Sequence, residues 1–156
     1  MTLTEWQRRL ADTVFQWVRP APSNGHPQSK AMILLVDDER ELIQMVAYRL
    51  LANGYEVMAA ASGEEALEKM AQQRPDAIIL DVMLPGLDGN QVAECLRQDE
   101  RTRAIPVIFL TGLAEPREVE RHNYQMGDRL MLAKPFTAEQ LLGLLQRALD
   151  QGKQRS

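Results

Sequence analysis

The stretch DVMLPGLDG at residues 81–89 decides the fold of this chain. It places a carboxylate, Asp81, directly after the largely apolar run of residues 76–80, and it continues at once into a tight turn. A short apolar run bounded by turn residues is typical of a buried strand. A polar side chain at the carboxyl end of such a strand lies where parallel α/β sheets carry their chemistry. Asp81 is therefore the first candidate for a functional residue.

Three further apolar runs also end in polar residues. The first of them ends in Asp37 and Asp38, another in Thr111, and the last in Lys134 followed by Pro135. If these segments are parallel strands of one sheet, all of their endings fall on the same edge. The sequence therefore predicts a site with three carboxylates, one hydroxyl and one ammonium.

Strand-like and helix-like segments alternate after residue 30. The strand-like segments are 31–36, 55–59, 76–80, 106–110 and 129–133, and the helix-like segments are 39–52, 63–72, 88–98, 115–126 and 137–150. Asn53-Gly54 ends the first helix, and Ser62 and Thr137 are placed to cap two later ones. Five βα units predict an α/β fold with a parallel sheet covered on both faces and joined by right-handed crossovers.

Taken together, Asp37-Asp38, Asp81, Thr111 and Lys134-Pro135, in this order and at these spacings, resemble the receiver domain of two-component response regulators. The resemblance covers residues 31–150. It implies a flavodoxin-like (βα)5 fold, a doubly wound parallel sheet with the strand order 2-1-3-4-5. In that order the acids meet outside the carboxyl ends of strands one and three.

Carboxylates that converge within a few ångströms repel one another unless a cation lies between them. Mg²⁺ prefers oxygen ligands and keeps several waters, so it suits a shallow acidic site. The resemblance implies that Asp38 and Asp81 bind Mg²⁺ directly and that Asp37 does so mainly through water. By the same resemblance, the backbone carbonyl of Met83 supplies a further ligand.

The resemblance also assigns a role to each remaining residue. Asp81 is the phosphoacceptor, which attacks a phosphoryl group carried by a histidine kinase or phosphotransfer protein. Lys134 neutralises charge on the transferred oxygens, and Thr111 donates its hydroxyl to the phosphoryl group. The Lys134-Pro135 bond is expected to be cis. Such a protein signals through protein contacts and is not an enzyme beyond catalysing its own phosphorylation and dephosphorylation.

One position departs from the receiver pattern. Receivers usually carry Tyr or Phe three residues before the lysine, and here that residue is Met131. A thioether fills space but makes no two-position ring switch. A scaffold or dimerisation module that does not respond to phosphorylation therefore stays open as an alternative. An aspartate-nucleophile phosphatase is disfavoured, because the second acid that it needs two residues after the nucleophile is replaced by Met83.

Composition limits the number of domains and the class of protein that this chain can form. The chain has 156 residues, 45% hydrophobic and 26% charged, which suits one globular domain with an extension. The net charge is −4, and residues 1–30 hold four basic against two acidic residues, so the remainder is the more acidic part. This balance argues against nucleic-acid binding by the main domain. With no apolar stretch of membrane length and no signal-peptide pattern, we expect a cytoplasmic protein.

The remaining metal-binding or nucleophilic residue types are predicted to carry no chemistry. Cys95 is the single cysteine and lies beside Val92 and Leu96 at helical spacing, so we expect a buried structural thiol. His26 lies in a linker and His122 in a polar helix, which gives little support to a histidine metal site.

The chain divides into four parts by sequence. We expect an amphipathic helix at residues 1–19, a proline-rich linker at 20–30, the receiver-like domain at 31–150 and a tail at 151–156. In the first part Leu3, Trp6, Leu10, Val14 and Trp17 fall within about an 80° arc of a helix. This stripe fits either a cap that packs on its own domain or a contact in a homodimer or with a partner.

The expected partners follow from this division. They are a histidine kinase or phosphotransfer protein and a downstream protein. A DNA-binding domain and a membrane are not expected among them, because only the short tail follows the last helix.

Overall fold

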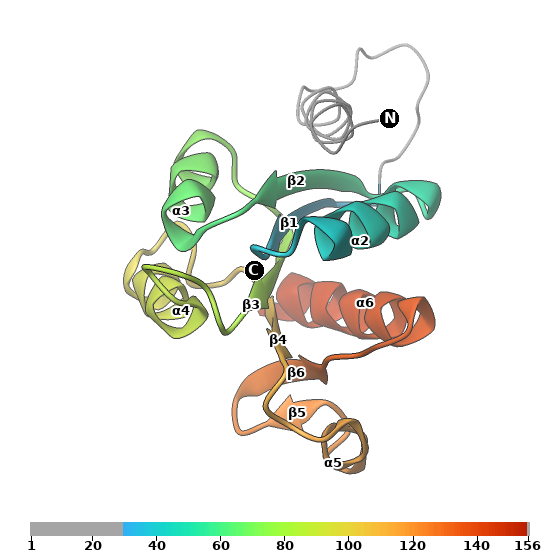
Figure 1. The fold of residues 1–156 in the computed structure, drawn as a ribbon. Coiled ribbons are helices and arrows are strands. Elements are labelled where there is room, and N and C mark those ends of the chain that lie inside the picture. The colour runs from blue at the N-terminus through green and yellow to red at the C-terminus, as the bar shows by residue number, and fades with distance from the viewer. Residues whose placement is uncertain (1–29, 156) are drawn as a thin grey trace.

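The computed structural model describes residues 30–155 and shows alternating strands and helices (Figure 1). The strands are β1 (Met32–Val36), β2 (Glu56–Ala60), β3 (Ala77–Asp81), β4 (Val107–Thr111), β5 (Gln125–Met126) and β6 (Arg129–Ala133). The helices are α2 (Arg40–Ala52), α3 (Gly63–Gln72), α4 (Gly89–Gln98), α5 (Pro116–Arg121) and α6 (Ala138–Arg155).

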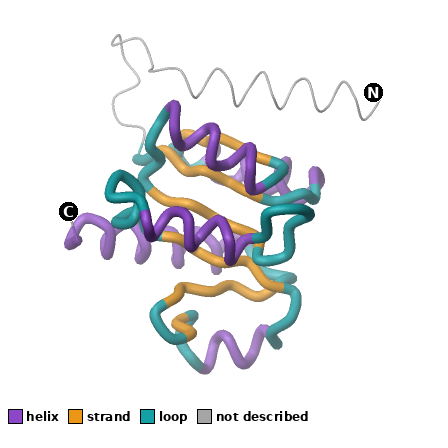
Figure 2. Tube along the Cα trace, turned by 90° about the vertical axis from the view of Figure 1, so that its left-hand side faces the viewer, coloured by secondary structure: helices purple, strands orange, loops and turns teal. Residues whose placement is uncertain are grey.

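One sheet holds all of these strands in the order β2-β1-β3-β4-β6-β5. The first five pair in parallel, whereas β5 pairs antiparallel with β6 at the edge. The predicted order 2-1-3-4-5 is therefore confirmed for the parallel strands, and β5 is an addition to it. Figure 2 shows β5 at one end of the sheet, next to α5.

Helices cover both faces of the sheet, with α2 and α6 on one side and α3 and α4 on the other (Figure 1). Alternate residues of each central strand face opposite layers, so Ile33 and Leu35 of β1 pack toward α2 and α6 while Leu34 packs toward α3 and α4. All of β1 is buried, as expected for a strand covered on both faces. This two-layer core holds the carboxyl ends of the strands rigidly in place.

Predicted helix caps are confirmed in detail. The Ser62 hydroxyl accepts a hydrogen bond from Glu65 N, and Thr137 and Gln140 satisfy each other's backbone N–H groups. Asp88 caps α4 by accepting from Gln91 N at 2.9 Å. Since Asp88 is engaged in this way, its carboxylate serves the start of α4.

The helix predicted at 115–126 is wrong in length, because α5 ends at Arg121. Asn123 and Tyr124 adopt left-handed φ values of 53° and 60°, which a right-handed helix cannot continue. The chain then turns into β5 to pair with β6, and Arg147 of α6 donates to Asn123 O at 2.6 Å. Tertiary contacts therefore override the local helical pattern.

The structure differs from the predictions for Cys95 and for the end of the last helix. Cys95 is exposed, so the expectation of a buried thiol is wrong. Val92 and Leu96 do face the core, but position 95 points about 100° away from Leu96 around α4. At the other end of the chain, α6 extends the helix predicted at 137–150 to Arg155, through most of the predicted tail.

The predicted amphipathic helix at 1–19 and nearly all of the linker at 20–30 lie outside the described residues. Of the helices within residues 30–155, none combines the length and the apolar character that crossing a membrane requires.

Candidate phosphoacceptor site

The carboxyl ends of β1 and β3 bring three acids together. Asp37 and Asp38 follow β1, Asp81 ends β3, and carboxylate oxygens of all three lie within 4.8 Å of one another. Asp37 and Asp81 are buried, whereas Asp38 is exposed. The predicted convergence of these acids at one sheet edge is thus what the structure shows.

Asp37 is completely buried and both of its carboxylate oxygens are engaged. One accepts a hydrogen bond from Glu39 N at 2.8 Å, and the other accepts from Lys134 Nζ at 3.0 Å. Burial raises the pKa of Asp37 to about 6, since these two hydrogen bonds only partly offset the cost of holding a charge away from water. The neighbouring Asp81 carboxylate adds to the rise in pKa.

Asp81 is held in a fixed orientation at the carboxyl end of β3. Its Oδ1 accepts from Met83 N at 2.9 Å and its Oδ2 accepts from Lys134 Nζ at 3.1 Å. The start of α4 presses directly against this position, because a side-chain Cβ at Gly89 would lie 2.2 Å from the Asp81 backbone oxygen. Gly89 is therefore required for α4 to approach β3 this closely.

Lys134, at the end of β6, contacts three carboxylates at once. Its ammonium lies 3.0 Å from Asp37, 3.1 Å from Asp81 and 3.3 Å from Glu39. Burial opposes the charge on Lys134, but the hydrogen bonds to Asp37 and Asp81 outweigh it and raise the pKa of the ammonium. The Lys134-Pro135 peptide bond is cis, as expected.

Thr111 ends β4, the strand next to β3, in which Asp81 pairs with Leu110. Thr111 is buried, and its hydroxyl oxygen accepts a hydrogen bond from Leu113 N at 3.1 Å. That bond uses a lone pair and leaves the hydroxyl proton for an acceptor near Asp81. Thr111 thus lies on the same edge as the carboxylates.

The donors at this edge fit a hard divalent cation. Three carboxylates, two of them buried, face the single ammonium of Lys134, so negative charge is left uncompensated among these groups. The ligand atoms that the three carboxylates offer are all oxygens. The hydrogen bond from Met83 N to Asp81 Oδ1 also places the Met83 backbone beside them. Mg²⁺ takes such oxygen ligands and retains water in shallow sites. The residues present are consistent with the predicted magnesium ligands.

Sequence reasoning missed Glu39 as a neighbour of the site. It follows Asp38 directly, and its side chain is 63% exposed while one oxygen reaches Lys134. Three consecutive acids at a strand end were the only available signal, and they also fit the start of a helix, where acids are favourable. Only the position of Lys134 distinguishes the two roles.

The surroundings of Met131 contain a second missed feature. Met131 is half-buried against the layer of α3 and α4. Two residues earlier, the Arg129 guanidinium lies 4.5 Å from the centre of the Phe109 ring and donates to Asn90 Oδ1 of α4 at 2.6 Å. These contacts tie β4, β6 and α4 together beside the position where receivers usually carry an aromatic ring.

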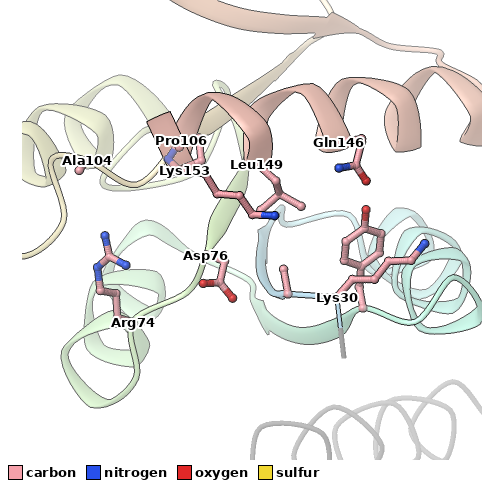
Figure 3. Close-up of a pocket in the computed structure, with 11 residues that line it drawn as sticks. Lys30, Arg74, Asp76, Ala104, Pro106, Gln146, Leu149 and Lys153 are labelled. Carbon is pink, nitrogen blue, oxygen red and sulfur yellow. The ribbon is translucent and has the colours of Figure 1, made fainter. Parts of the chain in front are cut away.

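A cavity of about 420 Å³ lies at the opposite end of the strands and does not include the carboxylate cluster. Its lining includes Ala31, Asp76 and Pro106, each directly before a strand, with Lys30 and Lys153 nearby (Figure 3). Asp76 there accepts a hydrogen bond from Met32 N at 2.8 Å. This cavity and the carboxylate cluster are therefore separate features.

The family model of the response regulator receiver domain matches residues 33–146. This chain belongs to that family. Accordingly, the flavodoxin-like fold and the phosphoacceptor role of response regulators apply to this receiver, and receivers are signalling domains and not conventional enzymes.

Individual relatives agree with this assignment. The receiver is 39% identical over 110 residues to the alkaline phosphatase synthesis transcriptional regulatory protein PhoP of Bacillus subtilis (strain 168), covering 70% of this chain and 44% of that protein. It is 37% identical over 117 residues to the DNA-binding dual master transcriptional regulator RpaA of a Synechocystis strain, covering 75% and 48%. Among solved structures, the chemotaxis protein CheY4 of Vibrio cholerae matches with a TM-score of 0.65 and 37% identity, covering 76% of this chain and 98% of that one.

These relatives correct the prediction of partners. The partners expected from the sequence were a histidine kinase or phosphotransfer protein and a downstream protein, without a DNA-binding domain. That prediction is wrong, because two proteins similar to this receiver carry the names of transcriptional regulators, and one of these names includes DNA binding. The chain spans a little under half the length of these two relatives, and net charge within the receiver carries no information on what the rest of such a regulator contacts.

Proposed function

We propose that Asp81 is the phosphoacceptor of this receiver and that Asp37, Asp38, Asp81 and the Met83 carbonyl hold Mg²⁺ there. The observation that carries the proposal is the fixed orientation of Asp81, with one carboxylate oxygen on Met83 N and the other on Lys134 Nζ. A carboxylate fixed in this way within a cluster of acids is positioned as a nucleophile.

In the transfer step, a carboxylate oxygen of Asp81 forms a bond to phosphorus as the bond between phosphorus and the donor breaks. The electron pair of the broken bond leaves with the donor, and Asp81 becomes an acyl phosphate. Hydrolysis reverses the change, with water attacking phosphorus and the Asp81 carboxylate leaving. The receiver catalyses both steps on itself by positioning and charge neutralisation.

A bound Mg²⁺ supplies charge neutralisation for the phosphoryl oxygens. Lys134 provides the second positive charge, since its raised pKa keeps it protonated throughout the neutral range. Once a phosphoryl group occupies one oxygen of Asp81, the ammonium is in position to donate to it. The Thr111 hydroxyl proton, which Leu113 N leaves available, is the second donor from the protein.

The test is intact-mass measurement after incubation with Mg²⁺ and acetyl phosphate. Wild type should gain one phosphoryl adduct, and Asp81→Asn should gain none. Asp88→Asn is the matched control, because Asp88 caps α4 in the same loop and asparagine caps helices as well as aspartate does. It should be phosphorylated like wild type.

Two outcomes would contradict the proposal. An adduct that persists in Asp81→Asn would place the acceptor elsewhere. No adduct on folded wild type would favour a scaffold that keeps the site without using it, the alternative suggested by Met131.

A further inference from the structure

The cavity of about 420 Å³ at the amino ends of the strands combines an apolar wall with charged side chains. Buried apolar residues such as Leu149 form part of its lining, and Lys30, Arg74 and Lys153 are exposed around it. Figure 3 shows Arg74 and Lys30 on opposite sides of Asp76, with Lys153 reaching across from α6. A volume of this size lies within the range of sites that bind small molecules.

Tyr55 lines the cavity with a hydroxyl that has no partner within residues 30–155. The side chain is only 2% exposed, and its hydroxyl forms no hydrogen bond with any of these residues. Every fully enclosed side-chain nitrogen or oxygen of the described residues does have a partner, so the small accessible part of Tyr55 includes this oxygen. A polar atom left without a partner on a buried side chain is a specific reason to expect a bound molecule.

The Tyr55 hydroxyl is held in place as a hydrogen-bond donor. Burial raises the pKa of Tyr55, and the Asp150 carboxylate adds to the rise, so the hydroxyl keeps its proton at neutral pH. The Lys30 ammonium lies 5.3 Å from the centre of the Tyr55 ring, and Lys30 N donates to Gly54 O at 3.0 Å. These contacts fix the ring, and a donor fixed before binding costs a ligand less entropy.

The cavity is positively charged, although the whole chain carries a net charge of −4. Three cationic side chains and one carboxylate, that of Asp76, line it, which leaves a net charge of +2. Within residues 30–155, neither Lys30 nor Arg74 lies at salt-bridge distance from a carboxylate. Arg74 donates from Nε to Arg101 O at 3.0 Å, which leaves its two terminal nitrogens for a ligand. Guanidinium groups bind the oxygens of phosphate and carboxylate groups in this way.

Asp76 indicates that the ligand also carries a donor. One of its carboxylate oxygens accepts from Met32 N at 2.8 Å, which leaves the other for a ligand hydroxyl. Leu149 and Pro106 are buried and offer an apolar surface to the rest of the ligand. This wall is tightly packed, because a Cβ at Gly152 of α6 would lie 3.1 Å from Pro106 Cδ.

We propose that this cavity binds a sugar phosphate, either free or as part of a mononucleotide. Arg74 and Lys30 bind the phosphate, and the Tyr55 hydroxyl donates to one of its oxygens. Asp76 accepts from a sugar hydroxyl. A phosphate monoester carries a charge of about −1.5 to −2 at pH 7, which balances the charge of the lining. The site lies at the opposite end of the strands from Asp81 and requires no Mg²⁺.

Calorimetric titration of the full chain in EDTA tests the proposal, with glucose 6-phosphate and adenosine monophosphate as separate probes. At least one probe should bind with a stoichiometry of one and a Kd below about 1 mM. The tighter of the two identifies the free sugar phosphate or the mononucleotide as the ligand. Glucose and adenosine lack the phosphate and should bind at least about tenfold more weakly. No binding of either phosphate, or equal binding without the phosphate, would overturn the proposal.

Two variants test the residues of the cavity. Tyr55→Phe and Arg74→Gln should each weaken binding of the tighter probe by about tenfold or more, the effect of one hydrogen bond to a charged group. Tyr48→Phe and Arg117→Gln are the matched controls, because they make the same chemical changes at exposed positions outside the lining. Both controls should bind like wild type. Equal losses in variants and controls would contradict a site in this cavity.

Urea denaturation separates binding from a structural role of Tyr55. The hydroxyl has no partner within residues 30–155, so Tyr55→Phe should not lower the denaturation midpoint of the ligand-free chain. A lower midpoint with unchanged affinity would mean that the hydroxyl serves the fold, which would overturn its assignment to the ligand. Asp81→Asn should bind the probe like wild type. Loss of binding in that variant would place the probe among the acids and would also overturn the proposal.

Discussion

Asp37 shows how burial sets the chemistry of a single residue in this receiver. It has the same side chain as Asp38, yet it is completely buried while its neighbour is exposed. Burial raises its pKa to about 6 even though Lys134 and Glu39 N both contact it. The charged form of Asp37 is therefore disfavoured in the folded protein, and a cation bound beside it would offset that cost.

Replacing Asp37 by asparagine should therefore stabilise the metal-free protein. Asn removes the buried charge and keeps similar shape, so we expect the free energy of unfolding at pH 7.5 to rise by roughly 1–3 kcal/mol, from about 1.4 kcal/mol for each unit of pKa. Magnesium affinity should fall at the same time. Urea denaturation with and without Mg²⁺ measures both effects.

Glu39→Gln is the control for this prediction. Glu39 also contacts Lys134, but its side chain is 63% exposed, so the change should alter stability by less than about 0.5 kcal/mol. If Asp37→Asn instead lowers stability without metal, attraction between Asp37 and Lys134 outweighs burial, and the account of Asp37 given above is wrong.

At the level of elements, the approach of α4 to the end of β3 positions Asp81, the proposed phosphoacceptor. Gly89 is the first residue of α4, and its α-carbon faces the backbone of Asp81 and Val82 with no room for a side chain. The Asp88 cap starts the helix at this point. A loop of only a few residues therefore fixes both the strand end and the helix start.

Gly89→Ala should destabilise the protein and impair the site together. The added carbon would lie 2.2 Å from the Asp81 oxygen and 2.8 Å from the Val82 α-carbon, so backbone must move. We expect a loss of about 2–3 kcal/mol or more in unfolding free energy and a lower phosphorylation yield from acetyl phosphate. Urea denaturation and intact mass measure the two effects.

Gly143→Ala in α6 provides the matched comparison. No atom lies within 4 Å of a Cβ built there, and the residue is exposed in a helix interior. The same substitution should raise stability by about 0.5–1 kcal/mol and leave the phosphorylation yield unchanged. Equal effects at the two glycines would rule out close packing of α4 as the cause.

At the scale of the whole molecule, the proposed magnesium binding, proton binding and folding involve the same acids. The unfolded chain releases the Asp37 proton near pH 3.8, whereas the folded protein holds it to about pH 6. Between these values the folded state binds more protons, so the contribution of Asp37 to stability falls as the pH rises. Magnesium needs the deprotonated carboxylates, so it opposes this loss.

Stability measured against pH should show this linkage. Without metal, wild type should lose stability relative to Asp37→Asn as the pH rises from about 4 to about 6. With Mg²⁺ at ten times its dissociation constant, wild type at pH 7.5 should gain about 1.4 kcal/mol, and the gain should disappear below pH 6. Thermal unfolding across pH, with magnesium-free and magnesium-loaded samples, measures both effects. Parallel stability curves for wild type and Asp37→Asn would contradict the assignment of this pH dependence to Asp37.

The sequence by itself determined the five parallel strands, the helix caps and which polar residues meet at one edge of the sheet. These features rest on local patterns, since apolar runs, cap residues such as Ser62 and strand-end acids act through neighbours close in the chain. The order of Asp37, Asp81 and Lys134 along a βα fold then places them on one edge of the sheet. The error at 115–126 arose where left-handed Tyr124 and pairing with β6 override a locally helical pattern.

Only the tertiary structure decided which of these acids is buried and which of them contact the Lys134 ammonium. Lys134 and Asp37 are 97 residues apart, and the contact of Lys134 with Glu39 depends on where the end of β6 lies. The exposure of Met45 and Tyr48 on α2, and that of Cys95 on α4, likewise depends on which face of each helix meets the sheet. Burial and electrostatic coupling are properties of distant groups brought together, and for that reason no local pattern contains them.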